Sequence, residues 1–379
     1  MNNQKWLKPE DSKLFTPWTD PVSGVTSYIL TERVAANQQA FYFTSPNITE
    51  DGRYVWLYLS FPPTPGHILG VLDMKEESLR MFPESSFVAE APFIDPKTGY
   101  AIWASRNEIF MRGPRLDDHT SLLGRIDAPG NMAGSQDYKG IRRLTTHLTR
   151  SADGKWLNID MIAGDEWHIG AFHIETGRYE HWQTFDACYK HAQFSPTDSD
   201  LMMICQDHWQ DIKTGKFNPY VNRLWLIRRG ETAMPIFPNV VRGDLHAHEW
   251  WAKNGKGIWY VNYEGGTHYV PLDTMRTELV WPGGTCHSHS STDDRYLVGD
   301  INVYQWNEKP VSVMFYNRVT GKEVTIATAL PAPVTRSKYH ADPHPQFVLH
   351  DEFIAYTTTV LGGLDFALVR TSDLIGATK

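Results

Sequence analysis

The stretch 286–300, "CHSHSSTDDRYLVGD", contains the unit that decides the fold of this chain. Two histidines one residue apart precede an Asp-Asp turn, and a short apolar strand follows the turn. Turns of this chemistry, followed by residues rich in Val, Ile, Tyr and Trp, are typical of a β-hairpin. We therefore expect His287 and His289 to share one face of the first strand, because alternate residues of a strand point to the same side.

The same unit recurs along the chain in seven copies. They read "TEDGRYVWLYLSF", "DPKTGYAIWAS", "SADGKWLNIDMI", "SPTDSDLMMIC", "AKNGKGIWYVNY", "STDDRYLVGDI" and "VLHDEFIAYTT". The copies lie about 40–57 residues apart, which is the spacing of propeller blades. Further strands follow in most units, and helical periodicity is almost absent. The sequence therefore predicts an all-β chain that forms a seven-bladed β-propeller with four short strands in each blade.

The domain organisation follows from closure of the ring. We expect residues 1–379 to form a single propeller domain. The N-terminal segment "SGVTSYIL" (23–30) is expected to complete the last blade, since closing the ring removes the exposed edges of an open array.

Histidine marks one position of the repeat. Alignment of the copies on the first apolar residue after each turn places these residues ten positions upstream: Ser45, Ala91, His147, His191, His248, His287 and His344. Five successive histidines at one position are improbable in a chain with 16 histidines among 379 residues. Because the strand before this turn is the innermost one of a blade, the five imidazoles are expected to converge at one mouth of the central channel.

Residues two positions away from these histidines point the same way. They include His246, His289 and Asp342. A single histidine on an inner strand is most often structural, but a ring of imidazoles with a carboxylate indicates a metal site. Such a donor set suits Mn, Fe, Ni or Zn better than Ca or Mg.

Composition excludes several other functions. The net charge is −8 and no Lys/Arg run stands out, which argues against a nucleic-acid or anionic-membrane partner. The polar start and the lack of an apolar run of roughly 20 residues predict a cytoplasmic protein. Three scattered cysteines predict reduced thiols and not a disulfide framework. No GxSxG, P-loop or GxGxxG motif is present, so serine peptidase and nucleotide chemistry are disfavoured.

At these residues the chain resembles the oligogalacturonate lyases, the pectin-degrading enzymes of carbohydrate metabolism. The resemblance covers nearly the whole chain, and four stretches carry it most specifically: "KHAQFSPTDSD", "NRLWLI", "HEWWAKNGKGIWYVNY" and "CHSHSSTDDRYLVGD". It implies a seven-bladed propeller with a divalent metal, Mn²⁺, and a catalytic histidine at the channel mouth.

The resemblance also assigns residues. His248 corresponds to the catalytic base and Arg223 to the arginine beside it, whereas His287 and His344 correspond to metal ligands. The family's remaining ligands come from a Gln-x-x-His-Pro-His-Pro pattern, and this chain has "YHADPHP" (339–345) in its place. Asp342 then replaces a histidine ligand, and Tyr339 or the adjacent His340 would cover the missing glutamine.

The implied reaction is β-elimination in an acidic oligosaccharide. His248 would remove the C5 proton, Arg223 would clamp a carboxylate or favour the neutral base, and the metal would neutralise the developing charge. The product is a 4,5-unsaturated uronate. Four further histidines are expected to bind substrate or donate to the leaving oxygen: His147, His191, His246 and His289.

Two alternatives stay open at this point. The changed ligand pattern favours a lyase for another uronate-containing oligosaccharide as one possibility. A non-catalytic propeller that binds an acidic sugar is the other, although it gives no reason for Arg223 and His248 to occur together. The sequence predicts neither the oligomeric state nor the preferred chain length.

Overall fold

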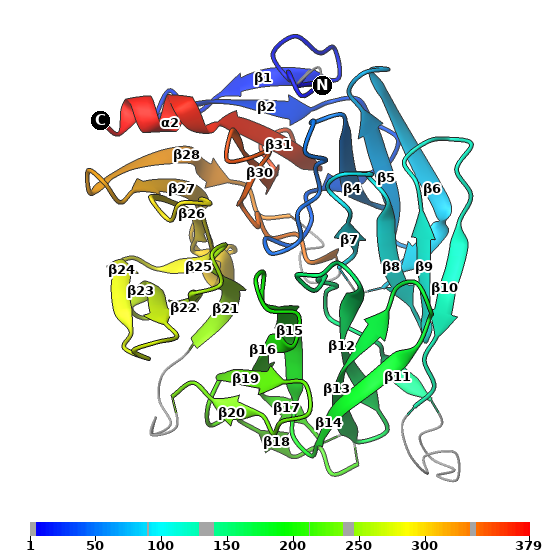
Figure 1. Cartoon of the computed structure of the whole chain (residues 1–379). Coiled ribbons are helices and arrows are strands. Elements are labelled where there is room, and N and C mark those ends of the chain that lie inside the picture. The colour runs from blue at the N-terminus through cyan, green and yellow to red at the C-terminus, as the bar shows by residue number, and fades with distance from the viewer. Residues whose placement is uncertain (1–4, 89–90, 129–139, 212, 238–245, 334–338) are drawn as a thin grey trace.

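The computed structural model describes residues 5–88, 91–128, 140–211, 213–237, 246–333 and 339–379. Strands make up nearly all of its regular structure, and they are grouped as blades around a common centre (Figure 1). The prediction of an all-β, seven-bladed propeller is confirmed. No helix in the described ranges combines the length and the apolarity that crossing a membrane requires.

Six of the blades described are antiparallel sheets whose strands follow one another in the chain. The first blade contains β4 (Tyr54–Ser60), β5 (His67–Asp73) and β6 (Ser78–Phe87). The second contains β7 (Phe93–Ile94), β8 (Ala101–Ser105), β9 (Glu108–Arg112) and β10 (Ser121–Arg125). The third contains β11 (Ile141–Arg143), β12 (Trp156–Ala163), β13 (Glu166–His173) and β14 (Tyr179–Phe185). The fourth blade contains β15 (Tyr189–Phe194), β16 (Leu201–Gln206), β19 (Leu224–Arg228) and β20 (Met234–Pro235). The fifth contains β21 (His246–Trp251), β22 (Gly257–Asn262), β23 (Gly266–Pro271) and β24 (Glu278–Trp281). The sixth contains β25 (Thr285–Ser290), β26 (Tyr296–Ile301), β27 (Val311–Asn317) and β28 (Lys322–Leu330).

The seventh blade combines strands from both ends of the chain. It contains β29 (Gln346–Val348), β30 (Phe353–Thr358), β31 (Leu364–Arg370), β2 (Thr26–Leu30) and β1 (Phe15–Thr19). β2 pairs with β31, so the N-terminal strand lies beside the C-terminal one (Figure 1). The assignment of residues 1–379 to one domain stays a prediction.

A few elements lie outside the blade pattern. β3 (Asn37–Gln39) pairs antiparallel with β4 and parallel with β31. β17 (Trp209–Gln210) and β18 (Phe217–Asn218) form a small hairpin between β16 and β19. The described helical elements are η2 (Val303–Gln305) and α2 (Thr371–Ala377).

Large side chains fill the space between neighbouring blades. Trp56, Trp103, Trp259 and Trp281 are fully buried. The second strand of a blade is apolar on both faces, as in β22, where five of six residues are buried. A strand covered on both sides reads as a continuous apolar run, which is why the repeat was visible in the sequence.

β-Bulges in the inner strands redirect the side chains of three aligned histidines. The register between first and second strands shifts at Lys190–Gln193 in β15, at Ala247–Trp250 in β21 and at Thr285–Ser288 in β25. Each shift contains one of the aligned histidines. A bulge leaves a residue unpaired and redirects its side chain, so these shifts turn His191, His248 and His287 away from the regular ladder.

Candidate active site

The aligned histidines of the last five blades lie close together. Their ring centroids are 5.3 Å apart for His147 and His191, 4.1 Å for His248 and His287, and 4.3 Å for His287 and His344. The ring of Tyr42 lies between the two groups, 5.5 Å from His147 and 4.9 Å from His344. The structure thus brings together the constellation expected from the register.

Three of these histidines have an unusual backbone. His191, His248 and His344 have φ values of 55°, 52° and 46°, in the left-handed region that non-glycine residues rarely adopt. Each such residue costs on the order of 1–3 kcal/mol, and strain of this kind clusters at functional sites. The surrounding hydrogen bonds must therefore hold these residues in place.

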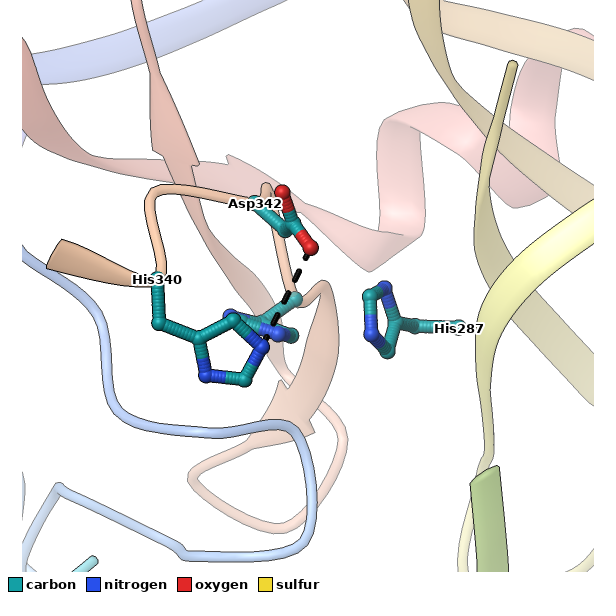
Figure 2. Close-up of side chains that lie close together, drawn as sticks. His287, His340 and Asp342 are labelled. Carbon is teal, nitrogen blue, oxygen red and sulfur yellow. Dashed lines mark ion pairs between the residues drawn. The ribbon is translucent and has the colours of Figure 1, made fainter. Parts of the chain in front are cut away.

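One cluster can hold a metal ion. His287, His340, Asp342 and His344 each offer a ligand atom, and these atoms lie within 4.8 Å of one another. Figure 2 shows His340 and Asp342 on one loop, facing His287 on a neighbouring strand. Nε2 of His340 is 3.9 Å from Oδ2 of Asp342. Three imidazoles and one carboxylate fit a divalent transition metal.

Asp300 positions the first ligand from behind. Nδ1 of His287 donates to Oδ2 of Asp300 at 2.9 Å, and the backbone N–H of His287 donates to Oδ1 at 2.8 Å. Burial alone would lower the pKa of His287, but the charge of Asp300 raises it well above its usual value. A carboxylate behind a histidine fixes its tautomer and directs Nε2 toward the metal. Gly299 permits this close approach, because an added Cβ would lie 2.8 Å from the carbonyl oxygen of His287.

His248 is held in the tautomer that a general base needs. Its Nδ1 donates to the carbonyl oxygen of Cys286. The hydroxyl of Tyr263 lies 3.3 Å from the same nitrogen. Burial, followed by the charge of His287, lowers the pKa of His248 well below its usual value. The ring is therefore neutral, with Nε2 unprotonated and able to accept a proton.

Arg223 is part of a buried ion-pair network. Its Nε and Nη2 both donate to the carboxylate of Glu249, the latter at 3.2 Å, and Nη1 is 3.1 Å from Oδ2 of Asp207. Lys190 lies 2.6 Å from the same Asp207 oxygen. Only 5% of Arg223 is exposed. Its planar fork is thus occupied by two carboxylates, which is a different arrangement from an open clamp.

A cavity of about 390 Å³ connects these groups. Its lining includes the base, several basic residues and three tyrosines: His248, Lys190, His191, Arg223, His246, His340, Tyr220, Tyr263 and Tyr304. Tyr42 also contributes to its wall. Aromatic walls with a few convergent polar groups are typical of a small-molecule site.

Comparisons with known proteins address the family. No family model matches the chain. The oligogalacturonate lyase of Dickeya dadantii (strain 3937) is 24% identical over 203 residues, which is 49% of this chain and 50% of that relative. The oligogalacturonide lyase of Pectobacterium atrosepticum matches to the same extent. The match thus spans about half the length of these curated relatives.

Solved structures extend the likeness to the whole fold. An oligogalacturonate lyase in complex with manganese has a TM-score of 0.73 at 16% identity, covering 94% of this chain and 96% of that one. The oligogalacturonate lyase of Vibrio parahaemolyticus has a TM-score of 0.74 at 17% identity, with the same coverage. The chain is similar to oligogalacturonate lyases in sequence over about half of its length and in fold over 94% of it. The resemblance expected from the sequence is confirmed.

The structure separates some residues that the sequence grouped together. The hydroxyl of Tyr339 donates to the carbonyl oxygen of Thr64 at 2.8 Å, whereas His340 belongs to the cluster of possible ligands. The assignment of either residue in place of the family's glutamine stays a prediction. His147 is buried at the back of the ring, whereas His289 lines a different cavity.

Several site residues were missing from the sequence analysis. Asp300 had a detectable signal, because it follows Leu297 by three residues, as Asp160 follows Leu157 in the third blade. Both carboxylates accept hydrogen bonds from the backbone of inner strands. Tyr42 carried no comparable signal, since it belongs to a connection between β3 and β4 and not to the aligned unit.

Proposed function

We propose that this oligogalacturonate lyase-like protein is a metal-dependent lyase that cleaves uronate-containing oligosaccharides, most directly oligogalacturonate, by β-elimination. The observation that carries the proposal is the short distance between the candidate base and a candidate metal ligand. The neutral ring of His248 lies 4.1 Å from the ring of His287, a member of the candidate metal cluster. A base beside a cation site is what proton removal next to a carboxylate requires.

The chemistry explains why both parts are needed. The C5 proton of a uronate is very weakly acidic, because its removal places a second negative charge beside an ionised carboxylate. A bound divalent metal supplies a positive charge that stabilises this developing charge by several kcal/mol. Nε2 of His248 accepts the proton, and positioned general bases contribute roughly 10²–10⁴-fold to such steps. The 4-linked oxygen then leaves, which produces the C4–C5 double bond.

We propose Mn²⁺ as the metal. The ligands would be His287, Asp342, His344 and His340. Support comes from the mixed imidazole and carboxylate donor set and from the manganese that a structurally similar lyase binds. Asp300 would hold His287 in place, so that metal binding does not require the ring to reorient.

Arg223 acts in this scheme through its fixed charge. Because Glu249 and Asp207 occupy its fork, substrate carboxylate binding is not assigned to Arg223, and His191 of the same cavity is proposed to bind substrate. The positive charge of Arg223 contributes to the lowered pKa of His248 and so favours the neutral base. His246 also lines the cavity and is proposed to bind substrate hydroxyls.

The proposal also covers the substrate, the location and the partners of the protein. A lyase acting on glucuronate or on rhamnose-linked uronate is the nearest alternative, because Tyr339 and Asp342 depart from the family pattern. The cytoplasmic location, and the expectation of neither nucleic-acid nor membrane partners, stay proposals from composition.

The experiment is a substrate panel. The protein, stripped of metal and then supplied with Mn²⁺, is incubated with oligosaccharides of galacturonate, glucuronate and rhamnose-linked uronate. We expect new ultraviolet absorbance from the conjugated double bond, only with Mn²⁺ present, and fastest with oligogalacturonate. His248→Ala protein prepared in parallel controls for contaminating lyase. Equal absorbance from both proteins, or none with any uronate, would refute the proposal.

A further inference from the structure

A second cavity lies at the opposite side of the histidine ring. The active-site cavity is lined by inner-strand residues at or before the aligned histidines, whereas residues that follow them line a separate cavity of about 210 Å³. These residues include Thr149, Gln193, Phe194, Trp250, Trp251 and His289. Along the inner strands, the two cavities therefore lie on opposite sides of the aligned histidines.

Two basic side chains line the second cavity, Lys253 and Arg150. Burial lowers the pKa of Lys253, and the charge of Asp351 offsets part of this effect. Arg150 is paired with Asp95 through Nη1 and lies 4.9 Å over the ring of Phe93. No Asp or Glu belongs to the described lining. The cavity therefore offers an ammonium group whose acidic neighbour, Asp351, lies outside the lining.

His289 adds a directed hydrogen-bond donor. Its Nδ1 accepts a hydrogen bond from the backbone N–H of Phe347 at 3.1 Å. The neutral ring then carries its hydrogen on Nε2, which is left to donate. Thr44 also lines the cavity, and its buried hydroxyl has no hydrogen-bond partner among the described residues. The polar groups of this cavity are thus arranged as donors for an anion.

We propose that the second cavity binds a small carboxylate-bearing sugar, with Lys253 and His289 holding the carboxylate. Its volume is below the roughly 300–1,000 Å³ of pockets for drug-sized ligands, which limits the occupant to about one sugar ring. Aromatic side chains of Phe93, Phe194 and Trp250 supply the apolar wall that a sugar ring packs against. This inference concerns binding alone and stands independently of the lyase proposal.

Isothermal titration with D-galacturonate tests the inference, with D-galactose as the uncharged match and inorganic phosphate as an unrelated anion. The informative variant is Lys253→Met. Lys256→Met is its control, because Lys256 is an exposed lysine on the same turn that does not line the cavity. Thermal unfolding of both variants verifies that they fold.

We expect two galacturonate sites, of which the one at the second cavity weakens about tenfold or more in Lys253→Met, since a charge-assisted hydrogen bond is lost, and is unchanged in Lys256→Met. Binding at the active-site cavity persists in both variants, so the difference isolates the second cavity. His289→Gln, which removes the Nε2 donor, should weaken the same site. Unchanged affinity in Lys253→Met, equal binding of galactose, or tighter binding of phosphate would each overturn the assignment.

Discussion

Nδ1 of His287 donates a hydrogen bond to the carboxylate of Asp300 at 2.9 Å, and both side chains are almost completely buried. The same carboxylate accepts the backbone N–H of His344 at 3.3 Å. One side chain of the sixth blade therefore positions two candidate metal ligands from two neighbouring blades.

Asp300→Asn should weaken metal binding without abolishing it. The amide keeps the shape but removes the charge that fixes the His287 ring, and loss of such an outer partner typically costs 10–100-fold in affinity. Equilibrium dialysis against Mn²⁺ measures the change.

Asp160→Asn provides the matched control for this substitution. Asp160 holds the equivalent position in the third blade, where it accepts hydrogen bonds from Thr146 and Ala192 and not from the candidate ligands. If both variants lose metal affinity equally, the effect comes from the propeller as a whole and the outer-partner role of Asp300 is wrong.

Substitutions at the cluster should separate ligands from neighbours. The double variant with His287→Ala and His344→Ala should lose stoichiometric metal, because two remaining groups hold a divalent ion poorly. His340→Ala should reduce the affinity, whereas Tyr339→Phe should not, since the tyrosine hydroxyl is bound to Thr64. Metal analysis by mass spectrometry distinguishes these cases. Undiminished metal in the double variant would show that the ion lies elsewhere.

His248→Ala should remove most turnover and leave metal content unchanged. The base contributes roughly 10²–10⁴-fold, and the proposed ligand set excludes this imidazole. Activity is followed by ultraviolet absorbance, and metal by elemental analysis of the same samples. Full activity in the variant would contradict the base assignment, and lost metal would show that His248 is a ligand.

Asp207 should make stability depend on acid pH. Burial raises its pKa, but the charges of Arg223 and Lys190 outweigh this effect and lower the pKa to about 2. A lowered folded-state pKa contributes stability above the unfolded value near 4, and this contribution disappears as the pH falls through about 2.

Asp207→Asn should therefore lose about 2 kcal/mol of unfolding free energy at pH 7 and show a shallower decline toward acid pH than the unsubstituted chain. Denaturant unfolding between about pH 2 and pH 7 measures this difference. Parallel stability curves for both proteins would mean that the carboxylate contributes nothing through its charge.

The fold could be predicted because its determinants are local and repeated. Each turn carries its own hairpin chemistry, and each second strand carries its own apolar run, as in Gly257–Asn262. Each turn-and-strand copy is weak evidence alone, but seven copies in one register together predict a propeller. The same register located His248, His287 and His344, because equivalent positions of inner strands face one channel.

The rest of the site depends on contacts that no repeat encodes. Tyr42 reaches the ring of histidines from a connecting segment, and the placement of His340 beside His344 depends on how one loop turns. Arg223 was expected to clamp a carboxylate or to favour the neutral base, and Glu249 occupies its fork from the adjacent blade. Such pairings join residues far apart in the sequence, so local patterns carry no information about them.

The measurement that tests the central claim most directly is the mass balance of the products from oligogalacturonate and the Mn²⁺-loaded protein. β-Elimination adds no water, so the two product masses should sum to the substrate mass, and one product should carry a 4,5-unsaturated uronate. The same products should be absent with His248→Ala. Products whose masses sum to the substrate plus one water would show hydrolysis and contradict the account.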